Sequence, residues 1–334
     1  MIRLPNKKVF KSLLISLFLL IAGGVKAFSF ELFQFSVAPK YAIQNGQMNE
    51  YVIYANGHTE SELNWDIKWL NLLGINASMG WEMLLLEANC MWGIPKSSGM
   101  MCDSDWLNKS NYGMKTDYSE SDNKITYLGN LDLRFGLNIK TWDFLHLIPY
   151  AGISYDRISF TALGGNYWYG DSGSTHLGYD VAYNDPLAKT GSFGTDNDVI
   201  TYDRETFNYK IGLKVKYNFF TRFTLAVDFG LAVFTQVNSV DHHVLKDNSS
   251  GAAYYLDKMQ GFFKSFDAAA EFDVNIWKGL SAGAGFKFVL INNTDGNDYC
   301  RKSTEKKYSI PSDGSKARTS GYYYNIEAFL RYSF

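Results

Sequence analysis

Residues 321–334 read GYYYNIEAFLRYSF, and the alternation in this stretch decides the fold. Counted back from the last residue, every second side chain is apolar or aromatic, whereas the intervening positions include Asn325, Glu327 and Arg331. Side chains of a β-strand point alternately to opposite faces, so one face of this strand is apolar and the other is mostly polar. The apolar face comprises Tyr322, Tyr324, Ile326, Ala328, Leu330, Tyr332 and Phe334.

The same period of two recurs in the segments 125–139, 223–233, 268–276 and 280–290. A soluble β-sandwich would also alternate. However, nearly every polar face carries charges, which a dry core could not solvate and a hydrated lumen can. Aromatic residues near the strand ends and the terminal Phe334 are typical of outer-membrane barrels. We therefore predict an all-β fold, a transmembrane antiparallel up-and-down β-barrel.

Short turns at 141–143, 219–222 and 278–279 alternate with long polar stretches. In outer-membrane barrels the long loops lie outside the cell, and the number of strands is even. We predict ten strands, although eight to twelve would be compatible with the pattern. Two strands precede residue 75, and the others cover 76–90, 123–140, 145–162, 206–218, 222–236, 262–277, 280–291 and 321–334. The predicted extracellular loops cover roughly 91–122, 163–205, 237–261 and 292–320.

Residues 1–27 have the features of a secretory signal peptide. Basic residues precede the apolar run 13–22, and Val25-Lys26-Ala27 provides small side chains for a cleavage site. The run is shorter than the roughly 20 residues that a transmembrane helix needs, which favours a cleaved signal over an anchor. We expect residues 28–334 to form one outer-membrane β-barrel domain.

Composition excludes several classes of protein. The chain has 334 residues of which 46% are hydrophobic, too many for an intrinsically disordered protein. The net charge is −2, and residues 1–27 carry five basic side chains and no acid, so the remainder is at −7. This charge argues against a nucleic-acid binder. Cys90, Cys102 and Cys300 lack a C-x-x-C spacing and allow at most one disulfide.

Two groups of reactive side chains fall in predicted loops on the same rim of the barrel. One is Asp103-Ser104-Asp105-Trp106 and the other is Asp241-His242-His243. Carboxylates with imidazole could bind a metal ion. They could also hydrolyse a bond with an activated water, because an Asp two residues before a His can orient a ring that accepts a proton. In that case the Asp pair would hold the water, and mutual repulsion would raise one pKa.

The phase of the strand before His243 complicates this interpretation. If the parity of Leu231 and Val233 continues, Asp241 and His243 point outward. Either the loop has already begun there, or a β-bulge resets the register.

The sequence resembles the omptin family of outer-membrane proteases over most of residues 28–334. Asp103-Ser104-Asp105-Trp106 resembles the family's D-x-D-W, and Asp241-His242-His243 resembles its catalytic D-x-H. The other similar segments are Ser61-Glu62-Leu63-Asn64-Trp65, Thr116-Asp117-Tyr118-Ser119, Ala151-Gly152, Arg157, Ser159-Phe160-Thr161-Ala162 and Gly164-Gly165.

This resemblance implies a ten-stranded barrel with an extracellular groove and endopeptidase activity without a cofactor. It implies that His243 is the general base and Asp241 its partner, while Asp103 and Asp105 position the water. No covalent acyl-enzyme is expected, although Ser119 lies close by in the sequence. The metal-dependent hydrolase stays open at this point.

The resemblance also implies peptide or protein substrates with Lys or Arg near the scissile bond. Glu50 matches one acidic substrate-binding residue of the family, whereas the second falls at Ser239, which weakens the expected preference for basic residues.

Arg157 matches a lipopolysaccharide contact of the family, so the resemblance implies lipopolysaccharide as an activator. Ile153 and Tyr155 replace the residues that usually accompany this arginine. We expect a monomer in the outer membrane with its active site facing the exterior. A non-enzymatic adhesin that binds host proteins is the main alternative, and a porin is the third.

Overall fold

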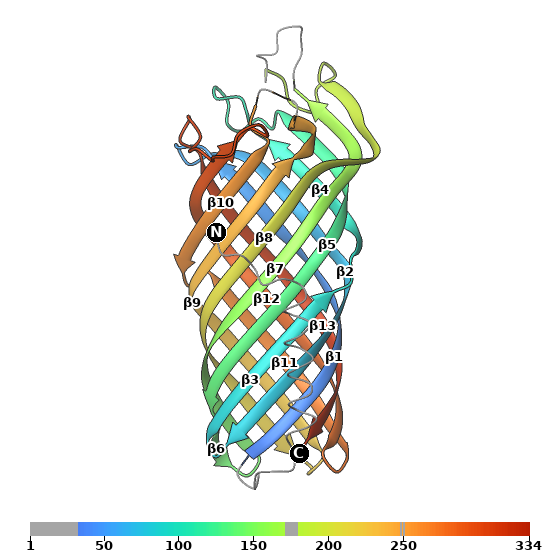
Figure 1. Ribbon diagram of the computed structural model, residues 1–334, viewed down its shortest axis with the longest axis vertical. Coiled ribbons are helices and arrows are strands. Elements are labelled where there is room, and N and C mark those ends of the chain that lie inside the picture. The colour runs from blue at the N-terminus through green and yellow to red at the C-terminus, as the bar shows by residue number, and fades with distance from the viewer. Residues whose placement is uncertain (1–32, 171–179, 248, 250) are drawn as a thin grey trace.

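A computed structural model shows one closed, elongated β-barrel (Figure 1). The structure describes residues 33–170, 180–247, 249 and 251–334. The predicted signal peptide at 1–27 lies outside these ranges. Over the described ranges, no helix has both the length and the apolar character that crossing a membrane requires.

Ten antiparallel strands form the wall, as predicted, and three of them are interrupted, among them β5, which β6 continues along β7. Both β3 and β4 pair with β2 and β5, so they are halves of one strand. In the same way β10 and β11 lie between β9 and β12, and β1 closes the ring with β13. The elements are β1 (Phe33–Ile53), β2 (Thr59–Trp81), β3 (Leu84–Gly93), β4 (Lys96–Asp105), β5 (Asp117–Leu137), β6 (Ile139–Trp142), β7 (Leu145–Tyr169), β8 (Lys189–Phe219), β9 (Phe223–His243), η2 (Val244–Lys246), β10 (Tyr254–Phe262), β11 (Ser265–Trp277), β12 (Leu280–Arg301) and β13 (Lys316–Ser333).

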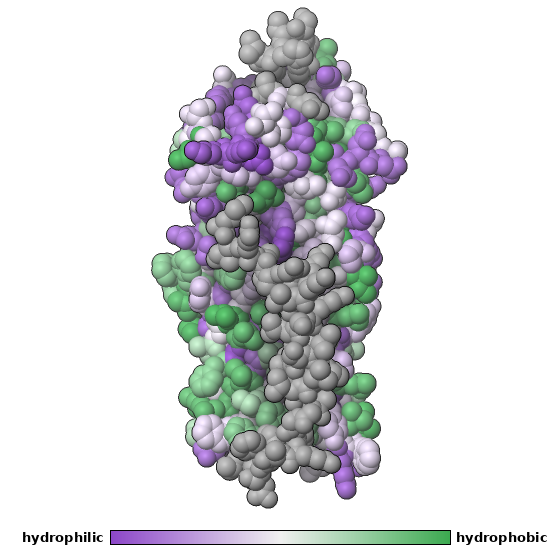
Figure 2. Space-filling model, viewed as in Figure 1, coloured by the Kyte–Doolittle hydropathy of each residue, from purple (hydrophilic) through white to green (hydrophobic). Residues whose placement is uncertain are grey.

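An apolar belt surrounds the half of the barrel that carries the short turns. Figure 2 shows hydrophobic residues over the lower half of the visible face and hydrophilic residues above them. The belt includes Tyr41, Leu73, Phe135, Ile211 and Leu330, all exposed and all on different strands. Exposed apolar side chains in such a band are the surface that a lipid bilayer covers. The outward apolar face predicted for 321–334 is thereby confirmed.

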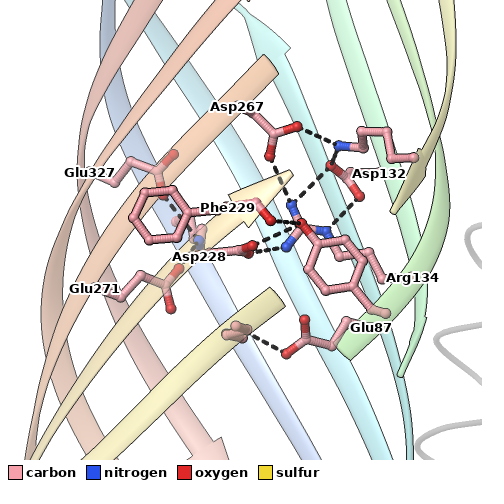
Figure 3. A network of polar contacts seen from close by, with 12 residues as sticks. Glu87, Asp132, Arg134, Asp228, Phe229, Asp267, Glu271 and Glu327 are labelled. Carbon is pink, nitrogen blue, oxygen red and sulfur yellow. Dashed lines mark hydrogen bonds and ion pairs between the residues drawn. The ribbon is translucent and has the colours of Figure 1, made fainter. Parts of the chain in front are cut away.

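Ion pairs fill the interior at the level of this belt (Figure 3). Arg134 contacts Asp132 at 2.9 Å and also contacts Asp228, while Lys210 contacts Asp132 at 2.6 Å and Asp267 at 3.2 Å. These pairs explain why the polar faces of the strands carry charges of both signs. Two cavities at this level measure about 40 and 60 Å³, and a third of about 600 Å³ shares Glu87, Lys214 and Glu271 with the second. The ion pairs across the lumen disfavour the porin hypothesis.

The strands extend much further than the sequence predicted. β4 and the first half of β8 lie within predicted loops, and β9 and β12 continue past residues 236 and 291. The predicted strand 76–90 is also wrong at its start, because the chain turns at 82–83 and 76–81 belongs to β2. Beyond the belt the outward face is polar, so the apolar alternation disappears although the ladder of hydrogen bonds continues.

A bulge in β9 determines which side chains enter the lumen near the loops. Tyr209 pairs with Phe234 and Lys210 pairs with Ala232, so Val233 has no partner on β8. Before the bulge the even-numbered residues are buried, as at Asp228. After it the buried positions are Thr235, Val237, Ser239 and Asp241. The structure therefore confirms the second explanation of the phase, a bulge that resets the register.

Candidate active site

A cavity of about 800 Å³ opens at the end of the barrel that carries the long loops. Its lining includes Asp103, Asp105, Asp241 and His243, so the structure brings together the four side chains predicted to be catalytic. On β1 the cavity is lined by Glu50, which follows the belt residue Tyr41 by nine positions. Nine residues span about 30 Å along a strand. The cavity therefore lies well beyond the apolar belt.

Asp241 and His243 form a close pair on the wall made by β9. Nε2 of His243 lies 2.8 Å from Oδ2 of Asp241, and Asp241 is buried. The ring of His243 also stands edge-on to Tyr255, with 5.2 Å between the ring centroids. Because Asp241 occupies Nε2, the other ring nitrogen, Nδ1, is the atom that can accept a proton from a reactant.

Asp103 and Asp105 lie near the end of β4, on a wall separated from β9 by three strands of the ring. Ser61 contacts Asp103 through its Oγ, which donates to Oδ1 over 3.5 Å. Burial raises the pKa of both carboxyls, and the charge of Asp105 raises that of Asp103 further. This pair therefore retains a proton more readily than two free aspartates would.

His243 lines the same cavity as this pair and interacts electrostatically with Asp105. Burial raises the pKa of Asp105, whereas a hydrogen bond from Ser61, the charge of Lys246 and the charge of His243 lower it. Lys246 belongs to η2, the short 3₁₀ turn that follows His243, and it lines the cavity. The sequence analysis missed Lys246 because one lysine in a predicted loop carries no signal.

A further wall of the cavity is acidic. Glu50 and Ser239, both expected to bind substrate, lie here with Asp257 and Asp298. Oγ of Ser239 donates a hydrogen bond of 3.1 Å to Oδ2 of Asp257. Burial and the neighbouring carboxylates raise the pKa of Glu50 and Asp257 well above the ordinary range, and that of Asp298 to about 6.

Asp257 and Asp298 were not predicted as site residues, because 237–261 and 292–320 have the polar composition of loops. In the structure both are inward-facing strand residues. Asp257 is the one acid in 254–262, and Asp295 and Asp298 are three positions apart, so no period of two marked these side chains in the sequence.

His242 lies outside the cavity, although it adjoins His243 in sequence. Its Nε2 contacts Oδ1 of Asp247 at 2.8 Å, and its ring stacks on Tyr254 with 3.9 Å between centroids. It is not among the residues that line the cavity. The two histidines therefore provide a matched pair, each next to an aspartate and only one in the groove.

Arg157 lies apart from the cavity, on β7. Its guanidinium contacts Asp203 at 2.5 and 3.1 Å and lies 5.5 Å from the ring of Tyr127. The side chain is only partly exposed, beside the upper edge of the belt, where Tyr127 and Ile153 are exposed. This location adjoins the lipid-facing surface, whereas Asp203 already neutralises part of its charge.

Metal ligation finds no support in the ranges that the structure describes. Across 33–170, 180–247, 249 and 251–334, no group of three or more His, Cys, Asp or Glu side chains is arranged to hold a metal ion. Cys90, Cys102 and Cys300 are free thiols.

The fold and the site together define a class, an outer-membrane β-barrel with a large cavity lined by carboxyl groups and His243. The chain belongs to the omptin family, whose model matches residues 32–334. It is 24% identical to "Plasminogen activator" of Yersinia pestis, over 97% of this chain and 99% of that protein. It is 28% identical to "Protease 7" of Escherichia coli strain K12, over 75% of this chain and 78% of that protein.

A solved structure, the outer membrane protease OmpT from Escherichia coli, matches the fold with a TM-score of 0.77. The identity is 20%, and the match covers 92% of this chain and 99% of that chain. The fold prediction and the resemblance found in the sequence are confirmed, and the chain is an outer-membrane β-barrel of a protease family.

Proposed function

We propose that this protein is an outer-membrane endopeptidase in which His243 activates a water molecule. The observation that carries the proposal is the 2.8 Å contact between His243 and Asp241 in a cavity that Asp103 and Asp105 also line. A general base held by a carboxylate, opposite a second carboxyl pair, is what hydrolysis by an activated water requires. The cavity opens toward the loops, so we place the active site on the cell exterior.

The proposed reaction needs two proton transfers. Nδ1 of His243 takes a proton from the water as its oxygen attacks the carbonyl carbon of the scissile peptide. Asp241 stabilises the imidazolium that forms, and the ring then returns the proton to the leaving amine as the C–N bond breaks. Asp103 and Asp105 hold the water, one carboxyl donating a hydrogen bond and the other accepting one.

The proposed reaction involves no acyl-enzyme. Ser119 lines the same cavity, but it pairs in register with Asp103 on the wall across from the histidine. A nucleophilic serine needs an adjacent base to remove its proton. β7 and β8 separate the strand of Ser119 from that of His243, so water is the nucleophile that fits the site.

We further propose cleavage next to basic residues. Glu50, Asp257 and Asp298 place three carboxyl groups on one wall of the cavity, and the positive charge of a Lys or Arg side chain would favour their ionised form. Peptides and proteins in the surroundings of the cell are the corresponding substrates.

The test compares two adjacent histidines in the refolded full-length barrel with lipopolysaccharide and a fluorogenic peptide that contains one internal Arg. His243→Ala should lower kcat/KM by about 10²–10⁴-fold, the usual contribution of a general base. His242→Ala is the matched control and should stay near the wild type. Equal cleavage by the His243→Ala variant would refute the assignment. Intact peptide in every sample would favour the adhesin.

We also propose that Arg157 contacts the anionic headgroup of lipopolysaccharide and that this contact activates the enzyme. Its place beside the upper edge of the belt supports this assignment. Arg157→Ala should then need more lipopolysaccharide for half-maximal activity, with an unchanged maximal rate. If Arg157→Ala reaches half-maximal activity at the same lipopolysaccharide concentration as the wild type, the contact is refuted.

A further inference from the structure

A half-buried lysine lies among aromatic rings on the outer face of the barrel, directly behind the carboxyl pair of β4. Nζ of Lys115 lies 5.2 Å from the ring centroid of Trp106, 5.4 Å from that of Tyr118 and 5.6 Å from that of Tyr183. The three rings come from the residue after β4, from β5 and from the segment that precedes β8. We call Lys115 and these rings the lysine cage.

The ammonium group in this cage contacts the strand that carries the pair. Nζ of Lys115 donates a hydrogen bond of 2.9 Å to Oγ of Ser104, which lies between Asp103 and Asp105 in the sequence. Neighbouring residues of a strand point to opposite faces, so Ser104 faces outward where the two carboxyls face the cavity. Tyr118 of the cage pairs in register with Ser104, and Ser104 is buried. The cage therefore covers the back of the strand at the position of the pair.

The backbone next to Lys115 holds the same strand end. The N–H of Thr116 donates to the carbonyl oxygen of Asp105 over 2.8 Å, and its hydroxyl donates to the same oxygen over 3.1 Å. The carbonyl oxygen of Lys115 accepts a hydrogen bond of 3.1 Å from the N–H of Tyr183. β4 ends at Asp105, and the terminal residues of a strand open easily unless further contacts hold them. Lys115 and Thr116 supply such contacts.

The charge of Lys115 also acts on the pair from behind the strand. Burial raises the pKa of Asp105, and Lys115 is among the groups whose charge lowers it again. Lys115 is not among the residues that line the cavity, so a peptide bound there does not touch it. Its influence on a reaction in the cavity therefore has to pass through the strand in front of it.

We propose that Lys115 is a positioning residue of the peptidase, whose ammonium group fixes Asp103 and Asp105 through the hydroxyl of Ser104. The inference rests on the proposed function and gives a role to Trp106, which the proposed reaction does not use. Attraction between the ammonium and the ring faces keeps the flexible lysine side chain in one place. The pair has to hold a water molecule at the carbonyl carbon, and a displacement of about 1 Å can cost about 10²-fold in rate.

The experiment compares two substitutions of Lys115 in the refolded full-length barrel with lipopolysaccharide and the peptide that contains one internal Arg. Lys115→Met keeps an unbranched stem between the rings and removes the ammonium. We expect kcat to fall by about 10–100-fold with little change in KM, because the substrate does not touch this residue. Lys115→Arg keeps the positive charge and the hydrogen-bond donors, so it should retain most of kcat.

A double-mutant cycle tests whether Lys115 acts through Ser104. Ser104→Ala removes the acceptor and should lower kcat as Lys115→Met does. If the two side chains form one link, the double variant should have the kcat of Lys115→Met alone. Losses that multiply in the double variant, or a wild-type kcat in either single variant, would overturn the proposal. If Lys115→Met does not fold, Ser104→Ala decides the question alone.

Lys258→Met is the matched control. Lys258 lies 5.8 Å from the ring of Tyr299, is exposed and does not line the cavity, so its removal should leave kcat at the wild-type value.

Amide hydrogen exchange provides a measurement that needs no activity. Exchange in the segment 101–107 should be faster in Lys115→Met than in the wild type, and unchanged in Lys258→Met. Equal exchange in Lys115→Met and the wild type would overturn the positioning role. If the wild type cleaves no peptide, the peptidase is overturned, while the exchange rates still decide whether Lys115 holds the end of β4.

Discussion

Nε2 of His243 lies 2.8 Å from Oδ2 of Asp241, two residues earlier on the same strand. Residues two apart on a strand share a face, so this contact needs no loop to arrange it. It does need that face to be the inner one, and the bulge at Val233 makes it so. The register of β9 beyond this residue therefore determines whether the ring lies in the groove or on the outer surface.

Asp241→Asn should remove most of the activity without changing the shape of the site. The amide cannot stabilise an imidazolium, and it can present its NH₂ group to the ring and thereby change the tautomer of His243. We expect kcat/KM to fall by about 10²–10⁴-fold, mainly through kcat. Steady-state kinetics with the Arg peptide measures this, and a rise in KM with an unchanged kcat would contradict the role of Asp241.

The bulge offers a test of the register itself. Deletion of Val233 removes the residue that has no partner on β8, so Ala232 and Phe234 become neighbours and Asp241 and His243 still face the lumen. We expect a folded barrel that keeps most of the activity. Insertion of one Ala after Gln236 in the deletion variant reverses the parity of Asp241 and His243 and should lower the activity to that of His243→Ala. Equal activities of the deletion and the insertion variants would contradict this account of the register.

The same bulge shows what could be predicted from the sequence. The period of two identified the strands, their apolar face and the number of strands, because lipid exposure imposes that pattern on every strand. At Val233 the pattern left two interpretations open, because a bulge is a property of pairing between strands and residue type does not specify it. The register between Tyr209 and Phe234 was needed to decide.

The acidic wall marks the other boundary of sequence reasoning. Asp103 and Asp241 belong to short motifs with recognisable spacing, whereas Asp257 and Asp298 are single acids. Above the belt both faces of a strand are polar, so nothing in the local pattern separates a strand from a loop. Only the pairing of β9, β10 and β12 brings these acids to one cavity.

Asp103→Asn should be better tolerated than Asp105→Asn. The pKa of Asp103 is raised well above its ordinary range, and that of Asp105 is raised less because a hydrogen bond from Ser61 and the charge of His243 oppose the effect of burial there. A raised pKa means that the protonated form persists to higher pH, and an amide resembles that neutral form. We expect Asp103→Asn to keep more of kcat/KM, and equal or reversed losses would contradict the protonation that we assign.

The pH profile provides a second measurement on the same pair. In the wild type, activity should decline at alkaline pH as Asp103 loses its proton and two negative carboxylates repel each other. Asp103→Asn cannot lose this proton, so its profile should lack that decline. An unchanged alkaline limb in the variant would assign the decline to another group.

Arg134→Ala should destabilise the barrel through its interior. Arg134 lies between Asp132, Asp228 and Asp267 at the level of the belt, and its removal leaves buried carboxylates with fewer counter-ions (Figure 3). Breaking a buried ion pair by removal of one partner costs about 3–5 kcal/mol, so the free energy of unfolding should fall by that order. Urea titration of the reconstituted barrel, followed by tryptophan fluorescence, measures the change.

Arg318→Ala is the control for this variant, because Arg318 pairs with Asp295 at the surface near the loops. Exposed ion pairs contribute about 0–1 kcal/mol, so the urea midpoint should hardly move. The two arginines thus separate the effect of burial from the effect of losing a guanidinium. If Arg134→Ala unfolds at the same urea concentration as Arg318→Ala, water entering the lumen must solvate the carboxylates, and the ion pairs then contribute little to stability.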